Sequence, residues 1–94
     1  HKGSGKAIIA DTENGPILKL EQFKVTSGPD LFVYLSKNRN IKETEDLGEF
    51  VSLGELKSTA GDQTYTLPEN YKDYHSVVIW CRAFGVLFSV AELQ

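Results

Sequence analysis

Cys81 is the only cysteine in this 94-residue chain, and its thiol has more chemistry open to it than any other side chain. It lies in the most apolar stretch of the sequence, S-V-V-I-W-C-R-A-F-G-V-L-F-S-V-A-E-L. A single cysteine cannot form an internal disulfide, so Cys81 is either an inert buried side chain or a reactive group. In an extended strand it shares a face with Val77 and Ile79, while Arg82 points the other way. These apolar neighbours disfavour a thiolate, so the residues alone favour the inert interpretation.

His75 is the residue that could make Cys81 part of a metal site. Six positions along an extended strand span roughly 20 Å, whereas zinc or copper needs both ligand atoms within about 2.3 Å of the ion. One straight strand therefore cannot supply both ligands. A blue-copper site needs two histidines and a cysteine, usually with an axial methionine, yet the chain has no Met and no His after Cys81. We expect no metal site.

Haem is the remaining prosthetic group to consider. His1, His75 and Cys81 are its candidate axial ligands. No C-x-x-C-H motif is present, so any haem would be bound non-covalently. His75 is more simply interpreted as a polar residue at a strand entrance, and His1 sits at a terminus, where fraying is expected. The cofactor therefore stays unknown, with haem as the named alternative.

Five aromatic residues could line a groove for a sugar or a flat cofactor, although such a set more often packs a core and its rim. They are Tyr65, Tyr71, Tyr74, Trp80 and Phe84. Hydrolytic chemistry finds little support, because no nucleophile motif brings serine, histidine and aspartate together. We therefore expect no catalytic residues, and an accessory module rather than a stand-alone enzyme.

Gly28, Pro29 and Asp30 predict a structural turn. Gly28 is expected to supply an unusual backbone angle, and Pro29 fixes its own φ. Asp30 is expected to cap the turn by accepting hydrogen bonds from backbone N–H groups. A tight hairpin turn is predicted at Asn14-Gly15, since both residue types tolerate positive φ.

The elements that must position these residues have the two-residue periodicity of strands. In residues 31–35, Leu31, Val33 and Leu35 share one face, and we expect this strand to be central. The expected strands cover residues 7–10, 17–21, 31–35, 51–56, 63–67, 77–81 and 86–93. The last two carry apolar residues on both faces, which predicts that they lie between layers rather than at an edge. About seven or eight short strands separated by turn residues indicate an all-β fold, a single antiparallel β-sandwich.

Residues 36–49 interrupt this pattern with a polar, charged run, S-K-N-R-N-I-K-E-T-E-D-L-G-E. We interpret the run as a solvated loop. Its acidic centre, Glu43 to Asp46, is a candidate recognition patch, but a charge run of this length is usually a solvated surface.

The composition limits the classes of partner. A net charge of -3 and a pI near 5.3 argue against nucleic acid and anionic membrane surfaces, which require a basic patch. The length fits one domain over residues 1–94. No apolar run reaches the length of a transmembrane helix, and the start does not resemble a signal peptide. Because the chain opens on His1 rather than Met, we expect a processed or excised piece of a longer protein.

Several segments taken together resemble the DM13 domain family. The most specific combination is G-P-D-L-F-V-Y-L over Gly28 to Leu35, followed some fifty residues later by V-V-I-W-C over Val77 to Cys81. The opening H-K-G-S-G-K-A, the strand L-K-L-E-Q-F-K-V and the segment L-K-S-T-A-G-D-Q-T-Y-T-L-P also match. The similarity covers nearly the whole chain, except that residues 36–50 contain no alignable motif.

The resemblance implies an extracytoplasmic β-sandwich, secreted or carried by a surface lipoprotein and lipid-anchored in its full-length form. In such proteins the domain stands alone or beside DOMON and cytochrome domains. It also implies electron transfer through the thiol at Cys81 or through a prosthetic group such as haem, with an unknown protein or redox partner. We therefore expect a redox accessory module. The alternative is an extracellular binding or adhesion module in which Cys81 is purely structural, and a dimer through the thiol is a third hypothesis.

Overall fold

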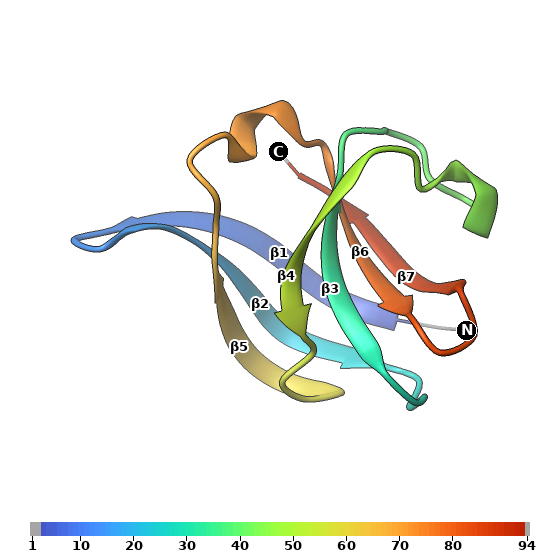
Figure 1. Ribbon diagram of the computed structural model, residues 1–94. Helices are drawn as coiled ribbons and strands as arrows, with labels where there is room; N and C mark the ends of the chain where they lie inside the picture. The colour runs from blue at the N-terminus through green and yellow to red at the C-terminus, as the bar shows by residue number, and fades with distance from the viewer. Residues whose placement is uncertain (1–2, 94) are drawn as a thin grey trace.

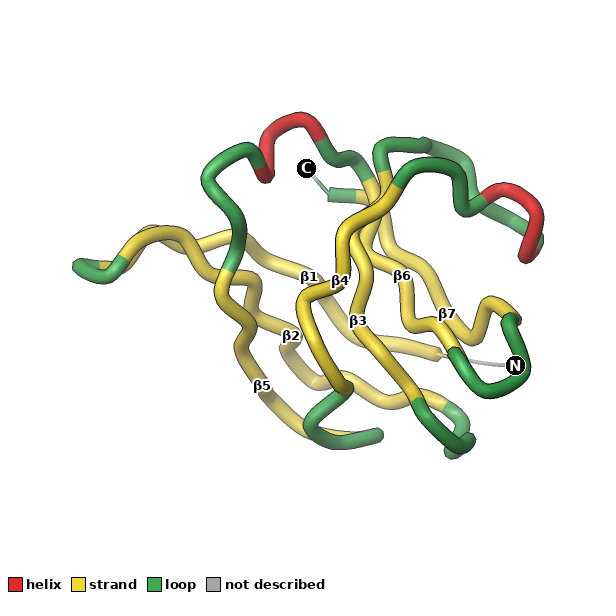
Figure 2. Tube along the Cα trace, viewed as in Figure 1, coloured by secondary structure: helices red, strands yellow, loops and turns green. Residues whose placement is uncertain are grey.

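The computed structural model describes residues 3–93, which form seven strands and two short 3-10 helices (Figure 1, Figure 2). The strands are β1 (Gly3–Thr12), β2 (Gly15–Val25), β3 (Leu31–Ser36), β4 (Phe50–Glu55), β5 (Ala60–Thr66), β6 (Ser76–Cys81) and β7 (Val86–Glu92). The helices are η1 (Thr44–Asp46) and η2 (Tyr71–Asp73). Within the described residues, none of the helices has the length and apolar character needed to cross a membrane.

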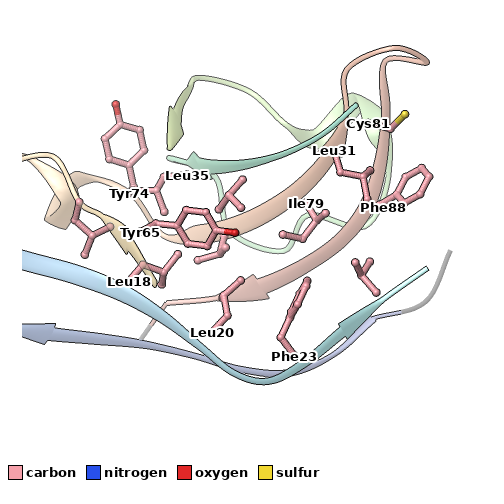
Figure 3. Packing of buried hydrophobic residues seen from close by; sticks show 14 residues of the cluster. Leu18, Leu20, Phe23, Leu31, Leu35, Tyr65, Tyr74, Ile79, Cys81 and Phe88 are labelled. Atoms are coloured by element: carbon pink, nitrogen blue, oxygen red, sulfur yellow. The ribbon is translucent and has the colours of Figure 1, made fainter. Parts of the chain in front are cut away.

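The strands form two antiparallel sheets that face each other, so the predicted sandwich is confirmed (Figure 1). One sheet has the order β1-β2-β5 and the other the order β4-β3-β6-β7. Side chains that alternate along each strand fill the space between the sheets. Those of the core are buried and are drawn in Figure 3. They are Leu18, Leu20, Phe23, Val25, Leu31, Val33, Leu35, Tyr65, Leu67, Tyr74, Val77, Ile79, Cys81 and Phe88.

Strand β3 is central, as its apolar alternation predicted. All six of its residues are buried, with Val33 and Leu35 at 0% exposure on the core side. It pairs with β4 on one side and with β6 on the other. The prediction for the last two strands holds for β6, which lies between β3 and β7, but is wrong for β7, which is an edge strand. The apolar residues on its outer side, Leu87 and Val90, are instead packed against a second hydrophobic cluster.

The segment between β3 and β4 is largely solvent-exposed, as predicted, but it also covers part of a sheet. Ile41 and Leu47 are buried and pack on the outer face of the four-stranded sheet with Phe32, Tyr34 and Val78. The Ser36 hydroxyl donates to the Leu47 carbonyl and fixes the return of the segment. The segment therefore explains why β6 can be apolar on both faces.

The acidic centre of this segment forms η1. The Asp46 carboxylate accepts hydrogen bonds from the backbone N–H groups of Lys42 and Glu43, each at 3.0 Å. These bonds hold the pKa of Asp46 below its ordinary value. Thr44 accepts a hydrogen bond from the Leu87 N–H at 3.1 Å, which ties the segment to β7. The acidic run is thus part of a folded turn.

The β1–β2 hairpin turns one residue earlier than predicted. Thr12 pairs with Gly15, so Glu13 and Asn14 form the two-residue connection. Gly15 has a φ of 108°, whereas Asn14 is not among the residues with positive φ. The predicted positive φ is therefore found at Gly15 but not at Asn14.

Candidate functional site

Cys81 is the last residue of β6, and its side chain faces the core. It lies directly opposite Leu31 of β3 and Val86 of β7. Its exposure is 0%, and it belongs to the same buried cluster as Val77 and Ile79, as strand alternation predicted. Figure 3 shows Cys81 at one end of this cluster, near Leu31 and Phe88. The thiol is sealed, but at the end of the sandwich rather than at its centre.

The thiol is covered by the turn between β2 and β3. Cys81 Sγ donates a hydrogen bond to the carbonyl oxygen of Pro29 at 3.0 Å. With no exposed surface, the sulfur cannot be reached by a reagent or a metal ion in this conformation.

Asp30 and Arg82 hold the turn against the end of β6. The Arg82 N–H donates to the Asp30 carbonyl at 3.0 Å, and Arg82 Nε donates to Asp30 Oδ2 at 3.2 Å. The guanidinium also lies over the Phe32 ring, 4.2 Å from its centroid, on the face of the sheet opposite Cys81. Because the ion-paired side chains are 60% and 34% exposed, this clamp is solvated and contributes little stability.

The predicted turn is present, but two of its residues act differently from the prediction. The Asp30 carboxylate accepts a hydrogen bond from Arg82 rather than from a backbone N–H group of the turn. Asp30 itself adopts the left-handed conformation, with a φ of 57°, whereas Gly28 does not. Gly28 is needed for space, because an added Cβ would lie 2.5 Å from Cε2 of Phe88.

The outer side of the same turn borders an open pocket of about 470 Å³. Gly28, Asp30 and Leu31 form one side of this pocket, and residues 55–59 form the other. Leu31 is also the cross-strand neighbour of Cys81. The pocket therefore borders the turn that contacts the thiol and the cross-strand neighbour of Cys81.

His75 lies just before β6, at the end opposite Cys81. Its N–H donates to the Ser36 carbonyl at 2.8 Å, and its own carbonyl accepts from the Leu93 N–H at 2.8 Å. Within residues 3–93, no group of three or more His, Cys, Asp or Glu side chains could hold a metal ion. The other histidine, His1, lies outside the described residues.

The predicted aromatic set is divided among different parts of the molecule. Tyr65 and Tyr74 belong to the inner core, and Tyr71 packs against it. Trp80 is on the outer face of β6, and Phe84 is 67% exposed in the turn before β7. No common groove unites the five.

Tyr65 has a structural role among these aromatics. Its hydroxyl donates to Gln63 Oε1 and accepts from the Lys57 N–H at 2.9 Å. Burial raises the pKa of this phenol above its ordinary value.

The structure instead brings together aromatic residues that the sequence did not connect. Tyr34 stacks on Phe50 with ring centroids 4.4 Å apart, and on Trp80 at 6.1 Å. Tyr34 contacts both rings because β3 pairs with β4, which carries Phe50, on one side and with β6, which carries Trp80, on the other. The Asp30–Arg82 clamp has the same origin, since the Leu31–Cys81 pairing places the flanking residues side by side.

The surroundings of Cys81 do not allow it to serve as an axial ligand of haem. The sulfur has no exposed surface and is engaged by the Pro29 carbonyl. An iron atom would have to displace both the turn and neighbouring core side chains. His75, at the other end of β6, cannot complete a site at Cys81.

Comparisons with known proteins identify the family. The sequence model of the family described as "Electron transfer DM13" matches residues 1–93, essentially the whole chain. No curated protein and no solved structure matches the chain. The chain therefore belongs to the DM13 family, whose description associates it with electron transfer.

Proposed function

We propose that the domain is a non-enzymatic redox accessory module, located outside the cytoplasm, in which Cys81 acts as a gated thiol. The family description supports a role connected with electron transfer. The observation that carries the proposal is that the only sulfur in the chain lies at one end of the core and is hydrogen-bonded to a short turn.

The turn is the part of this end that can open at the lowest cost. Residues 26–30 belong to no strand, whereas Val77 and Ile79 lie in β6 and pair with β3. The Asp30–Arg82 ion pair that fastens the turn is solvated. Apart from Gly28, which packs against Phe88, the residues of the turn are exposed, and segments with few buried contacts open locally at a free energy below that of global unfolding.

The chemistry of the opened state is thiol–disulfide exchange with a partner disulfide. Cys81 loses its proton to solvent, and the thiolate attacks one sulfur of that disulfide. A new S–S bond joins Cys81 to the partner, the partner's own S–S bond breaks, and its second sulfur leaves as a thiolate. Because the chain has no second cysteine, a thiol from another molecule must resolve the mixed disulfide.

A binding or adhesion module is the second candidate. The observation that favours it is the complete burial of Cys81 together with its bond to Pro29, which suits a small packing residue. In that case the thiol would react only after the whole domain unfolds.

Labelling with dithiobis-nitrobenzoate (DTNB) under native conditions tests the gate. Asp30→Asn removes the ionic partner of Arg82 but keeps a side chain that tolerates positive φ. We expect it to speed labelling of Cys81 roughly two- to fivefold, the scale of one solvated ion pair. Lys37→Gln is the matched control, because it breaks the exposed Lys37–Glu49 pair, whose N–O distance is 2.7 Å, away from the turn.

The gated-thiol proposal fails if Asp30→Asn and Lys37→Gln label at the wild-type rate while all three proteins are equally stable. That result would leave Cys81 as a packing residue and favour the binding module.

A further inference from the structure

The end of the sandwich opposite Cys81 has an open pocket with a basic and aromatic lining. Its volume is about 480 Å³, within the range of roughly 300–1,000 Å³ that small-molecule sites occupy. Arg39, Lys72 and His75 contribute basic groups, and Tyr71 and Tyr74 contribute rings. These residues come from the β3–β4 segment and from the connection before β6.

The cationic side chains of this pocket form no ion pair within residues 3–93. Among residues 3–93, the side chains of Arg39, Lys72 and His75 have no hydrogen bond or ion pair. Two acids lie close by: Asp73 follows Lys72 in the sequence, and Glu92 Oε1 accepts a hydrogen bond from the Asn40 N–H at 3.2 Å, one residue from Arg39. In a chain of net charge -3, two unpaired cations, Arg39 and Lys72, point to an anionic ligand.

The remaining lining suits a flat, apolar body. Ile9 and Leu93 form part of the wall beside the two tyrosines. Tyr74 is 9% exposed and Lys37 Nζ lies 5.6 Å from its ring centroid, so little of its face is open to a ligand, and Figure 3 shows its hydroxyl outermost. Tyr71 is half-buried and offers the larger ring surface. Tyrosine rings provide a large stacking surface at low conformational cost.

The pocket is held in shape by backbone hydrogen bonds. His75 is fixed between Ser36 and Leu93, with both N–O distances at 2.8 Å. The Tyr74 N–H donates to the Tyr71 carbonyl at 3.0 Å, which closes η2. A lining fixed in this way loses little conformational entropy when a ligand binds.

We propose that this pocket binds a small organic anion, with a flat ring against Tyr71 and a phosphate or carboxylate group toward Arg39 and Lys72. The site is separate from Cys81 and does not depend on a redox role for the thiol. It is also too small and too local for a nucleic acid, which needs an extended basic surface.

The test uses flavin mononucleotide and riboflavin, which share a ring system and differ by one phosphate, with inorganic phosphate as a third probe. Fluorescence titration at low salt is expected to give tighter binding for flavin mononucleotide than for either other probe. The double variant Arg39→Gln/Lys72→Gln should weaken that binding roughly tenfold and leave riboflavin binding nearly unchanged. Lys19→Gln/Lys24→Gln, on the other sheet, removes the same charge and is expected to bind like the wild type.

Equal affinity for the two flavins would overturn the role of the cations. Tighter binding of inorganic phosphate than of flavin mononucleotide would overturn the role of the rings. Weakening by the Lys19/Lys24 variant equal to that of the Arg39/Lys72 variant would reduce the effect to net charge and contradict a local site. None of these results bears on the labelling of Cys81, so this inference and the gated thiol fail independently.

Discussion

The two ends of β6 differ although one six-residue strand connects them. At its last residue, Cys81 is sealed from solvent and hydrogen-bonded to Pro29. Just before its first residue, His75 borders an open pocket beside Arg39 and Lys72. One end buries the thiol, whereas the other presents two unpaired cations.

The difference arises from the segments that cover each end. The turn at Gly28 closes on Phe88 because glycine has no Cβ to keep the ring away. The connection at η2 is polar, with Lys72 exposed, so it frames the other end without filling it. Strand alternation determines which face of the sheet each side chain lies on, whereas the connecting segments determine which of these side chains are exposed to solvent.

Gly28→Ala should produce the largest loss of stability, because the new methyl group would meet the Phe88 ring at the sealed end. We expect a loss of about 1–3 kcal/mol in the free energy of unfolding, measured by urea denaturation. Ser27→Ala, on an exposed neighbour, is the control and should stay within about 0.5 kcal/mol of the wild type. Wild-type stability for Gly28→Ala would show that the turn is not closely packed.

Cys81→Ala should have the next largest effect. It removes a fully buried sulfur and leaves the Pro29 carbonyl without its donor, at a cost of about 1–2 kcal/mol. Urea denaturation under reducing conditions measures this cost. An unchanged unfolding midpoint would mean that the thiol is only loosely held.

Arg39→Gln and Lys72→Gln should leave stability almost unchanged, within about 0.5 kcal/mol, because neither side chain has a partner in the described chain. The same urea series provides the measurement. A loss of stability comparable to that of Cys81→Ala would contradict the difference between the two ends, because it would show that Arg39 and Lys72 stabilise the fold.

The smallest effect is expected in the alkaline range at the open end. Glu49 hydrogen-bonds Lys37 and raises its pKa, so the folded state holds this proton more tightly than the unfolded chain. The stabilisation is intact below the pKa of a free lysine and is lost as the pH rises through the higher folded value. Tyr65, whose pKa is also raised, contributes a loss in the same direction.

Urea midpoints measured from pH 9 to pH 12 should therefore fall less steeply for Lys37→Gln than for the wild type. Parallel curves would show that the Lys37–Glu49 pair does not stabilise the folded state.

The sequence predicted what depends on strand alternation. The central position of β3 and the shared face of Val77, Ile79 and Cys81 follow from a period of two residues. It did not predict that Ile41 and Leu47 are buried, because two isolated apolar residues in a charged run have no periodicity.

Other features depended on partners distant in the chain. The need for glycine at position 28 comes from the nearby ring of Phe88, and the role of Asp30 comes from its hydrogen bond with Arg82. The edge position of β7 depends on sheet order, which its own composition does not encode. The sequence therefore predicted which way Cys81 faces, but not the turn that covers it.

The most direct test of the gated thiol is the urea dependence of Cys81 labelling by DTNB, compared with the urea dependence of global unfolding. Local opening of the turn exposes little surface, so the labelling rate should stay nearly constant at low urea and join the global curve only near the unfolding transition. A labelling rate that rises from the lowest urea concentration with the full slope of global unfolding would contradict the gate. Cys81 would then be reached only by unfolding the sandwich.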